Sequence, residues 1–270
     1  MAKKTNESAF KFGWVPDLPD QRDLIFSGAL KTMQHLPLKV DLRKNCPPIL
    51  TQGDLGSCTA NSLGSAFQFG QMKQAIPNFI PSRLFLYYNE RAMEGTIPVD
   101  SGAQIRDGIK SLNKQGVCAE TNWTYDDDTQ SPNAKFAQKP PKVCYDKALT
   151  NQILNYQRLN NASLIQLKAC LSEGYPFVFG FTAYVSFFKI KKNGVMPMPL
   201  PNEKVAGGHA VMAVGYDEKK QVFIVQNSWG KSWGDKGYFY MPYAYITDTH
   251  LSDDFWTIRL VEKGVKLKRE

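Results

Sequence analysis

Residues 52–62 read Gln-Gly-Asp-Leu-Gly-Ser-Cys-Thr-Ala-Asn-Ser, and Cys58 stands where this glycine-rich segment gives way to a helical pattern. The first turn of a helix lies at the positive end of the helix dipole and carries amides without an intrahelical partner. This setting favours the thiolate, the nucleophilic form of cysteine. A buried structural cysteine is the alternative, but the two preceding glycines let the backbone bend sharply and a substrate approach closely. The segment therefore predicts that Cys58 is a nucleophile.

A thiolate nucleophile needs a base, and the chain has three histidines. His35 and His250 lie in polar segments and are predicted to face solvent. His209 follows Gly207 and Gly208 at the entry to an apolar strand. A histidine in such a place is often an ordinary core residue, but the two glycines leave open space where a substrate would lie. His209 is therefore the candidate base.

Asn227 ends the next predicted strand, in the sequence Gln-Asn-Ser-Trp-Gly. If residues 217–221 form a hairpin loop, Asn227 returns close to His209 across an antiparallel pair. Its side-chain oxygen can then accept from one ring nitrogen and fix the orientation of the imidazole. Trp229 and Trp233 either cover this pair from water or are ordinary core aromatics.

The periodicity of the apolar residues divides the chain near residue 150. Ser57 and Ser101 are candidate N-caps, and helices are predicted at 58–74, 81–94, 101–115 and 163–173. A polar, proline-containing connection covers 125–145, and strands are predicted at 177–184, 209–216, 222–227, 238–241 and 255–260. Helices followed by strands predict an α+β fold. We expect a mainly helical lobe at 37–150, a mainly β lobe at 151–262, and the site in the cleft between them.

Composition and missing motifs exclude other classes of protein. The net charge is +8, but the densest basic cluster is a tail at 263–270 that reads as solvated, so we expect no nucleic-acid partner. No apolar run of about 18 residues is present, so we expect no membrane partner either. The chain lacks Cys-x-x-Cys and paired histidines, which predicts no metal and no cofactor. The segment 230–232 lacks the first glycine of a phosphate loop, and no Gly-x-Ser-x-Gly motif occurs.

Four ordered motifs resemble those of the papain family of cysteine proteases. They are Leu36-Pro-Leu-Lys-Val-Asp-Leu-Arg, the segment Gln52–Cys58, Gly208-His209-Ala-Val and Asn227-Ser-Trp-Gly-x-x-Trp-Gly, and together they span about residues 37–260. The resemblance implies a papain-like two-lobe α+β fold, with a helical half, an antiparallel β-sheet or barrel half, and the active-site cleft between them. It also implies hydrolysis of protein or peptide substrates through a thioester acyl-enzyme.

The resemblance assigns a role to each motif residue. Cys58 is the nucleophile, and His209 is the base that later acts as acid toward the leaving amine. Asn227 orients the imidazole. Gln52 and the backbone amide of Cys58 form the oxyanion hole, since a fixed donor at that point stabilises the developing charge.

The substrate cleft is also assigned by the resemblance. Ser101-Gly-Ala-Gln-Ile aligns with the family's glycine-rich wall, so Gly102 is expected to bond to an extended peptide backbone beside Ala103. Ile105 is expected to line an apolar subsite. Gly207 and Gly208 are expected to leave room for the substrate on the other side.

The cysteines depart from the family pattern. Thr59 stands where an aromatic residue usually follows the nucleophile, and Leu55 stands where a disulfide cysteine is common. Three pairings are open to the four other cysteines, Cys46, Cys118, Cys144 and Cys170. We expect Cys46–Cys118 if a bridge forms, because both residues flank the helical half. Reduced thiols are the alternative.

The N-terminal leader, residues 1–36, is shorter than the family's usual helical pro-domain. Its proline-containing segment 12–23 is pre-ordered for extended binding, so we expect it to lie across or beside the cleft and restrain activity. The alternative is an ordinary arm packed on the core. No histidine lies between His35 and His209, so the histidine-bearing loop of related dipeptide-trimming enzymes is not expected. An endopeptidase made as a zymogen is the favoured interpretation.

Two other functions could use the same residues. A transpeptidase or amidase would pass the acyl group to an amine, and a non-catalytic module would only hold peptides. The second is disfavoured because all four catalytic positions are filled. We expect a monomer. No apolar run follows the basic N-terminus, so no Sec-type signal peptide is predicted, which leaves a cytoplasmic location or another export route.

Overall fold

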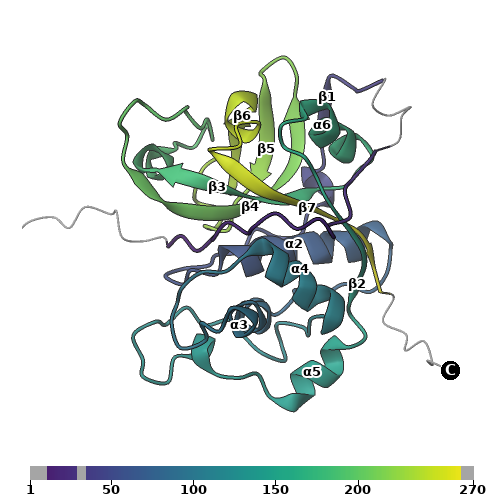
Figure 1. Cartoon of the computed structure of the whole chain (residues 1–270), viewed down its shortest axis with the longest axis vertical. Helices are drawn as coiled ribbons and strands as arrows, with labels where there is room; N and C mark the ends of the chain where they lie inside the picture. Colours follow the sequence, from purple (N-terminus) through teal and green to yellow (C-terminus); the bar gives the residue numbers. More distant parts are fainter. Residues whose placement is uncertain (1–10, 29–34, 263–270) are drawn as a thin grey trace, which may run out of the picture.

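The computed structural model of the chain describes residues 11–28 and 35–262, which form two lobes (Figure 1). One lobe consists of helices and the other is built on an antiparallel sheet, so the α+β class is confirmed. No helix within the described ranges is long and apolar enough to cross a bilayer. The division near residue 150 remains a prediction. One segment that precedes it in the chain belongs to the sheet, because β1 (Lys39–Asp41) pairs with β4 (Val205–Asp217).

The helical lobe follows the predicted pattern at its centre. Its elements are α2 (Cys58–Lys73), α3 (Arg83–Glu94), α4 (Ile105–Lys114) and α5 (Lys142–Ala148), with the 3-10 turn η2 (Lys135–Ala137). A further 3-10 turn, η1 (Arg43–Asn45), directly follows β1. The helices predicted at 58–74 and 81–94 are confirmed. The sequence analysis missed α5, because this helix has only seven residues and its first four, 142–145, lie within the stretch interpreted as a connection.

The third predicted helix begins later than expected. Its N-cap is Gln104 and not Ser101, so the predicted cap at Ser101 is wrong. Gly102 takes a positive φ of 76°, outside the right-handed helical region, and so separates Ser101 from the helix. The Ser101 hydroxyl donates to Thr96 and to the carbonyl of Gly102 instead.

The sheet lobe has the strand order β2-β7-β3-β4-β5-β6, with β1 beside β4. The further elements are β2 (Ile153–Arg158), α6 (Leu164–Ser172), β3 (Phe177–Tyr184), η3 (Val185–Lys189), β5 (Val222–Gln226), β6 (Tyr238–Pro242), α7 (Tyr243–Ile246) and β7 (Ser252–Val261). The five predicted strands and the helix at 163–173, capped by Ser163, are confirmed. The sequence analysis missed β1, which has three residues, and β2, which is an edge strand with a single fully buried position.

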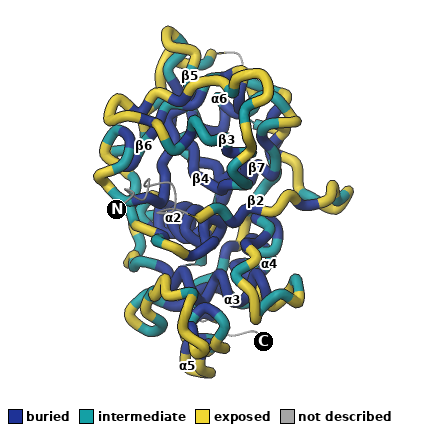
Figure 2. Tube along the Cα trace, turned by 90° about the vertical axis from the view of Figure 1, so that its left-hand side faces the viewer, coloured by how far each residue is buried: buried dark blue, intermediate teal, exposed yellow. Residues whose placement is uncertain are grey.

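Helix α2 lies between the two lobes and is buried on nearly every side. Figure 2 shows α2 and β4 as the dark blue centre of the molecule. The helix contacts β4 and β7 on one side and α3 and α4 on the other. Two of its hydroxyls donate to carbonyls of the same helix, Ser62 to Thr59 and Ser65 to Asn61, at 2.9 and 3.0 Å. These bonds satisfy polar groups that would otherwise be costly to bury. The N-terminus of α2 is thereby fixed at the junction of the lobes.

All five cysteines are free thiols. The expected Cys46–Cys118 bridge is therefore wrong. Cys46 lies on the sheet side, where its Sγ donates to the Leu42 carbonyl at 3.3 Å. Cys118 is buried in the helical lobe, and its side chain hydrogen-bonds with that of Cys144. The two residues of the predicted pair thus have different partners.

Candidate active site

Cys58 is the first residue of α2 and is fully buried. Ser57 is the N-cap by position, but its hydroxyl bonds to Tyr125 Oη at 2.5 Å and does not cap the helix. Burial raises the pKa of the Cys58 thiol to about 12, although the backbone amides of Ala210 and Gly13 bond to the side chain and favour the thiolate. In this structure burial outweighs the helix terminus, and Cys58 is a thiol.

His209 and Asn227 form a buried pair. The distance between His209 Nε2 and Asn227 Oδ1 is 2.8 Å, and the same oxygen accepts from the amide of Ser228 at 2.8 Å. The ring of Trp229 covers the imidazole at 5.0 Å between centroids, as one of the two sequence-based alternatives expected. Within the described part of the chain, His209 Nδ1 has no hydrogen-bond partner. Burial lowers the pKa of His209 to about 4, so the imidazole is neutral.

The hairpin assumed from the sequence explains how this pair forms. Strands β4 and β5 are antiparallel, with Asp217 opposite Val222, and Asn227 follows the end of β5. His35 and His250 are exposed, as expected. Trp233 is only partly buried and contacts Trp229, so it forms an outer layer of the aromatic cover.

Gln52 is held in place by the segment that carries Asn227. Its Oε1 accepts from the Ser228 hydroxyl at 2.6 Å, and its backbone amide donates to the Ser228 carbonyl at 2.8 Å. Its Nε2 donates to the carbonyls of Leu55 and Lys11, both at 3.0 Å. The sequence analysis missed this role of Ser228, although the residue lies in the quoted asparagine motif. Ser228 connects the oxyanion-hole candidate to the His209–Asn227 pair.

Residues 11–28 of the leader run between the two lobes (Figure 1). On the sheet side, the amides of Gly13 and Trp14 donate to the Gly208 carbonyl at 3.0 and 2.9 Å. On the helical side, the Ala103 amide donates to Gly13 at 2.7 Å, and Val15 donates to the Ala103 carbonyl at 3.0 Å. The leader therefore bridges both walls and covers Cys58.

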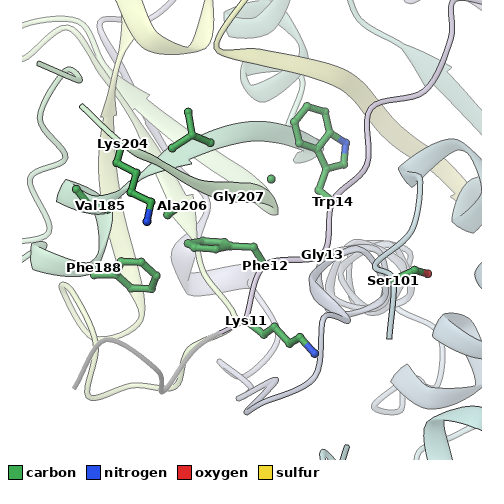
Figure 3. A pocket seen from close by; sticks show the side chains of 12 residues that line it. Lys11, Phe12, Gly13, Trp14, Ser101, Val185, Phe188, Lys204, Ala206 and Gly207 are labelled. Carbon is green, nitrogen blue, oxygen red and sulfur yellow. The ribbon is translucent and has the colours of Figure 1, made fainter. Parts of the chain in front are cut away.

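Phe12 and Trp14 fill the cleft on either side of Gly13. Figure 3 shows the two rings directed away from each other, with Phe12 toward Phe188. The Phe12 ring is 5.4 Å from that of His209 between centroids. A cavity of about 530 Å³ remains beside the leader, lined in part by Phe12, Trp14, Phe188 and Gly207.

The residues predicted for the substrate cleft lie in different surroundings. Gly207 and Gly208 face the leader, and a Cβ on Gly208 would lie 2.2 Å from the Trp14 carbonyl oxygen. Gly102 does not present its amide, which donates to Tyr87 Oη at 3.0 Å; its neighbour Ala103 makes the backbone bonds instead. Ile105 is fully buried in the core and does not line the cavity.

A cluster of charged residues anchors the leader and was missed by the sequence analysis. Asp17 is bonded by Arg106 through Nε at 3.0 Å and Nη2 at 2.9 Å, and by Arg158 Nη1 at 2.9 Å. Asp23 also pairs with both arginines. Burial alone would raise the pKa of Asp17, but the bonds from Arg106 and its neighbours hold it below the usual value. We call these four residues the leader clamp.

Comparison with known proteins is consistent with this geometry. The family model for papain family cysteine proteases matches residues 36–254. The uncharacterized peptidase C1-like protein L477 of Acanthamoeba polyphaga mimivirus is 42% identical, over 95% of this chain and 89% of that protein. The crystal structure of xylellain, a cysteine protease from Xylella fastidiosa, matches with a TM-score of 0.88 and 44% identity, over 97% of this chain and 100% of that one. Pro-cathepsin H of Bos taurus is 28% identical over 79% of this chain, which spans 62% of that protein.

Proposed function

Because the chain belongs to the papain family of cysteine proteases, we propose that it is an endopeptidase made as a zymogen, with Cys58, His209, Asn227 and Gln52 as its catalytic residues. The observation that supports this proposal is the buried His209–Asn227 pair, whose neighbour Ala210 donates its backbone amide to the side chain of Cys58. Ser228, next to Asn227, also holds the side-chain amide of Gln52.

The tautomer of His209 determines the direction of proton transfer. Asn227 Oδ1 can only accept, so His209 Nε2 carries the proton of the 2.8 Å bond. The other ring nitrogen, Nδ1, is then the base, and within the described residues nothing else occupies it. In the open enzyme, Nδ1 takes the proton of Cys58 as the sulfur attacks the substrate carbonyl.

The remaining steps use the same groups. The oxyanion formed by the attack accepts from Gln52 Nε2 and from the Cys58 amide, which stabilises the tetrahedral intermediate. The intermediate collapses, the C–N bond breaks, and His209 returns its proton to the leaving amine. Water, deprotonated by His209, then hydrolyses the thioester and frees the enzyme. Asn227 keeps the imidazole in place through both halves of the reaction.

The leader keeps this machinery inactive in the full chain. The side-chain amide of Gln52 donates to the Lys11 carbonyl, and a substrate oxyanion would need this same donor. Burial beneath the leader also leaves Cys58 with a raised pKa and His209 with a lowered one, so neither residue carries a charge. Moving the leader admits water and substrate, and both pKa values return toward those of an exposed pair.

The decisive experiment compares the full chain with Cys58→Ala. After prolonged incubation with a peptide library, during which the leader opens or is cut, internal cleavages are expected for the unsubstituted chain, and an epoxide reagent directed at thiols should label the exposed Cys58. The Cys58→Ala variant should lose turnover by at least a thousandfold, because the acyl-enzyme cannot form. Cleavage that survives in the variant would contradict the proposal.

An added amine tests the alternative acyl acceptor. If mass spectra show peptide–amine products in place of hydrolysis products, the chain is a transpeptidase with the same nucleophile. A chain that binds peptides but neither cleaves them nor reacts at Cys58 would contradict both.

A further inference from the structure

The two proposed oxyanion donors stand at opposite ends of one short loop. Gln52 begins this loop, residues 52–57, which we call the nucleophile loop, and Cys58 directly follows it. The loop contains Gly56 and also Gly53, whose φ is 61°, so its own backbone has a wide choice of conformations. Catalytic donors must nevertheless be held within about 0.5 Å of the productive geometry. The distance between these two donors therefore depends on what holds the ends of the loop.

The hydroxyl of Tyr125 joins the two ends of the nucleophile loop. Tyr125 Oη donates to the Gln52 carbonyl at 2.7 Å and lies 2.5 Å from Ser57 Oγ. A phenol has one proton and a carbonyl can only accept, so the Ser57 hydroxyl donates to Tyr125. Ser57 Oγ in turn accepts from Asn61 Nδ2, in the first turn of α2, at 3.0 Å. One directed chain of hydrogen bonds thus runs from the helix of the nucleophile to the backbone of Gln52.

Tyr125 is itself held in place by a buried arginine. The Arg83 guanidinium lies over the Tyr125 ring, 3.7 Å from its centroid, and pairs with Glu120 at 2.8 Å. Arg83 Nη1 also donates to the Thr51 carbonyl at 3.0 Å and to Asn61 Oδ1 at 3.2 Å. Glu120 accepts from the backbone amide of Tyr125 at 3.0 Å. The tyrosine therefore has a fixed position relative to both the nucleophile loop and α2.

Two observations indicate that this hydroxyl does more than fill space. Ser57 occupies the N-cap position of α2 but bonds to Tyr125 and does not cap the helix. A serine at this position normally accepts from an amide of the first turn, and the lost cap costs stability. Burial also raises the pKa of Tyr125, so its hydroxyl keeps the proton that it donates to the Gln52 carbonyl. The local structure favours the link across the loop over the cap.

We propose that Tyr125 is a positioning residue, which sets the distance between the Gln52 side-chain amide and the Cys58 backbone amide through its bonds to Gln52 and Ser57. The inference rests on the proposed peptidase function and deepens it. In this role Tyr125 does not touch the substrate, so its loss weakens the hold on the oxyanion and leaves ground-state binding nearly unchanged. Removal of a complete oxyanion donor typically costs about 10²–10³ in kcat, and displacement of a donor should cost less.

The test compares Tyr125→Phe with Tyr216→Phe in the full chain. Tyr216 is the matched control, because its hydroxyl also donates to a backbone carbonyl, that of Pro37 at 2.6 Å, and lies 3.2 Å from a serine hydroxyl, that of Ser172. Each chain is incubated until its turnover is constant, and the epoxide reagent counts the molecules with an accessible Cys58. Per accessible site, Tyr125→Phe should lose about tenfold to a hundredfold in kcat, with KM within about twofold. Tyr216→Phe should match the unsubstituted chain within about twofold.

Two reagents separate positioning from a general structural effect. The Cys58 sulfur adds to the carbonyl carbon of a peptide aldehyde, the thiol proton passes to the oxygen, and this oxygen lies where the oxyanion would form. Dipyridyl disulfide has no carbonyl and only exchanges with the sulfur. We expect Tyr125→Phe to bind the aldehyde about tenfold more weakly or worse, while the exchange rate at Cys58, followed by mass mapping, stays within about twofold. Ser57→Ala breaks the same chain of bonds, so it should also weaken the aldehyde, and adding it to Tyr125→Phe should cost no more than about twofold further.

Equal aldehyde affinity in Tyr125→Phe and Tyr216→Phe would overturn the inference. A fall in the exchange rate as large as the fall in aldehyde affinity would overturn it too, because Tyr125 would then support the nucleophile and not the oxyanion donors. If Tyr125→Phe does not fold, Ser57→Ala carries the same comparison. If the unsubstituted chain neither cleaves peptides nor reacts with the epoxide at Cys58, the proposed function itself has failed, and the inference fails with it.

Discussion

Cys58 and His209 are both held in their uncharged forms by burial. The sequence places the cysteine at a helix terminus that favours thiolate, yet burial beneath the leader raises the thiol pKa to about 12. The imidazole pKa falls to about 4 for the same reason. Desolvation therefore opposes the helix dipole at this site and outweighs it. In the proposed mechanism, the thiol and the neutral imidazole of the closed chain become an acid–base pair only when the leader opens.

This state predicts a pH dependence of stability that depends on His209. Because the pKa of His209 is about 4 in the folded chain and about 6.5 when exposed, its contribution to stability is present above pH 6.5 and is lost as the pH falls through 4. Between pH 7 and pH 4 the free energy of unfolding should fall by about 2–3 kcal/mol more in the unsubstituted chain than in His209→Gln. Urea unfolding at both pH values measures this difference. An equal fall in the free energy of unfolding in the unsubstituted chain and in His209→Gln would contradict the prediction.

At this scale the sequence predicts the site residues better than their surroundings. Cys58, His209 and Asn227 lie in short local motifs whose chemistry is evident from residue type and spacing. Ser228 and Asp254 act through partners far away in the chain, since Ser228 bonds to Gln52 and Asp254 to Trp14. No local pattern marks such contacts. Gly102 shows the same limit, because its backbone amide donates to the hydroxyl of Tyr87, which its own motif does not contain.

Among the elements, the leader depends most on buried charge. Arg106, near the start of α4, joins the carboxylates of Asp17 and Asp23 and also donates to the Leu18 carbonyl at 3.0 Å. An arginine in such a cluster is costly to remove, because its buried partners lose their counter-charge. The leader clamp therefore resists opening while the acidic residues of the leader stay in place.

Arg106→Ala should loosen the leader without touching the catalytic residues. We expect an uncharged alkylating reagent to label Cys58 at least tenfold faster in this variant, because Asp17 and Asp23 lose their principal partner. Lys110→Ala is the matched control on the same helix, since within residues 11–28 and 35–262 Lys110 forms an ion pair only with Asp107, at 3.7 Å. Its labelling rate should stay within about twofold of that of the unsubstituted chain. Equal rates in the two variants would show that the clamp does not hold the leader.

The elements that the sequence missed are those formed by tertiary contacts. Strand β2 has a weak pattern of its own and is held at the sheet edge by β7. Strand β1 is three residues long and exists because β4 extends far enough to pair with it. The longer helices and strands carry their own periodicity, and their existence was predictable. The start of α4 was not, because the positive φ of Gly102 depends on the leader and Tyr87 around it.

At the scale of the whole molecule, the lobes are joined where the last strand meets the central helix. Gln74, the C-cap of α2, donates to the Val261 carbonyl at 2.8 Å and accepts from the Val261 amide at 2.7 Å. Gly70, one turn earlier, lies against the side chain of Val261. The end of β7 is thereby attached to the helix that carries Cys58 at its other end.

Gln74→Ala should weaken this attachment measurably. Two hydrogen bonds to backbone groups are lost, so we expect a destabilisation of about 2 kcal/mol, or roughly 4–8 °C in Tm. Calorimetry measures the shift, and Gln130→Ala, at an exposed position, should change the Tm by less than about 2 °C. A Tm for Gln74→Ala that matches the Gln130→Ala control would contradict the prediction.

The Gln52 side-chain amide donates to the Lys11 carbonyl in the closed chain. In the proposed mechanism it donates to the substrate in the open enzyme, so the leader is a tethered competitor of the substrate. A competitor carried on the same chain has a fixed local concentration, so diluting the protein does not release it. Turnover in a fresh sample would then begin with a lag whose length is independent of enzyme concentration when opening is unimolecular. The lag would shorten as enzyme concentration rises only when one molecule cuts the leader of another.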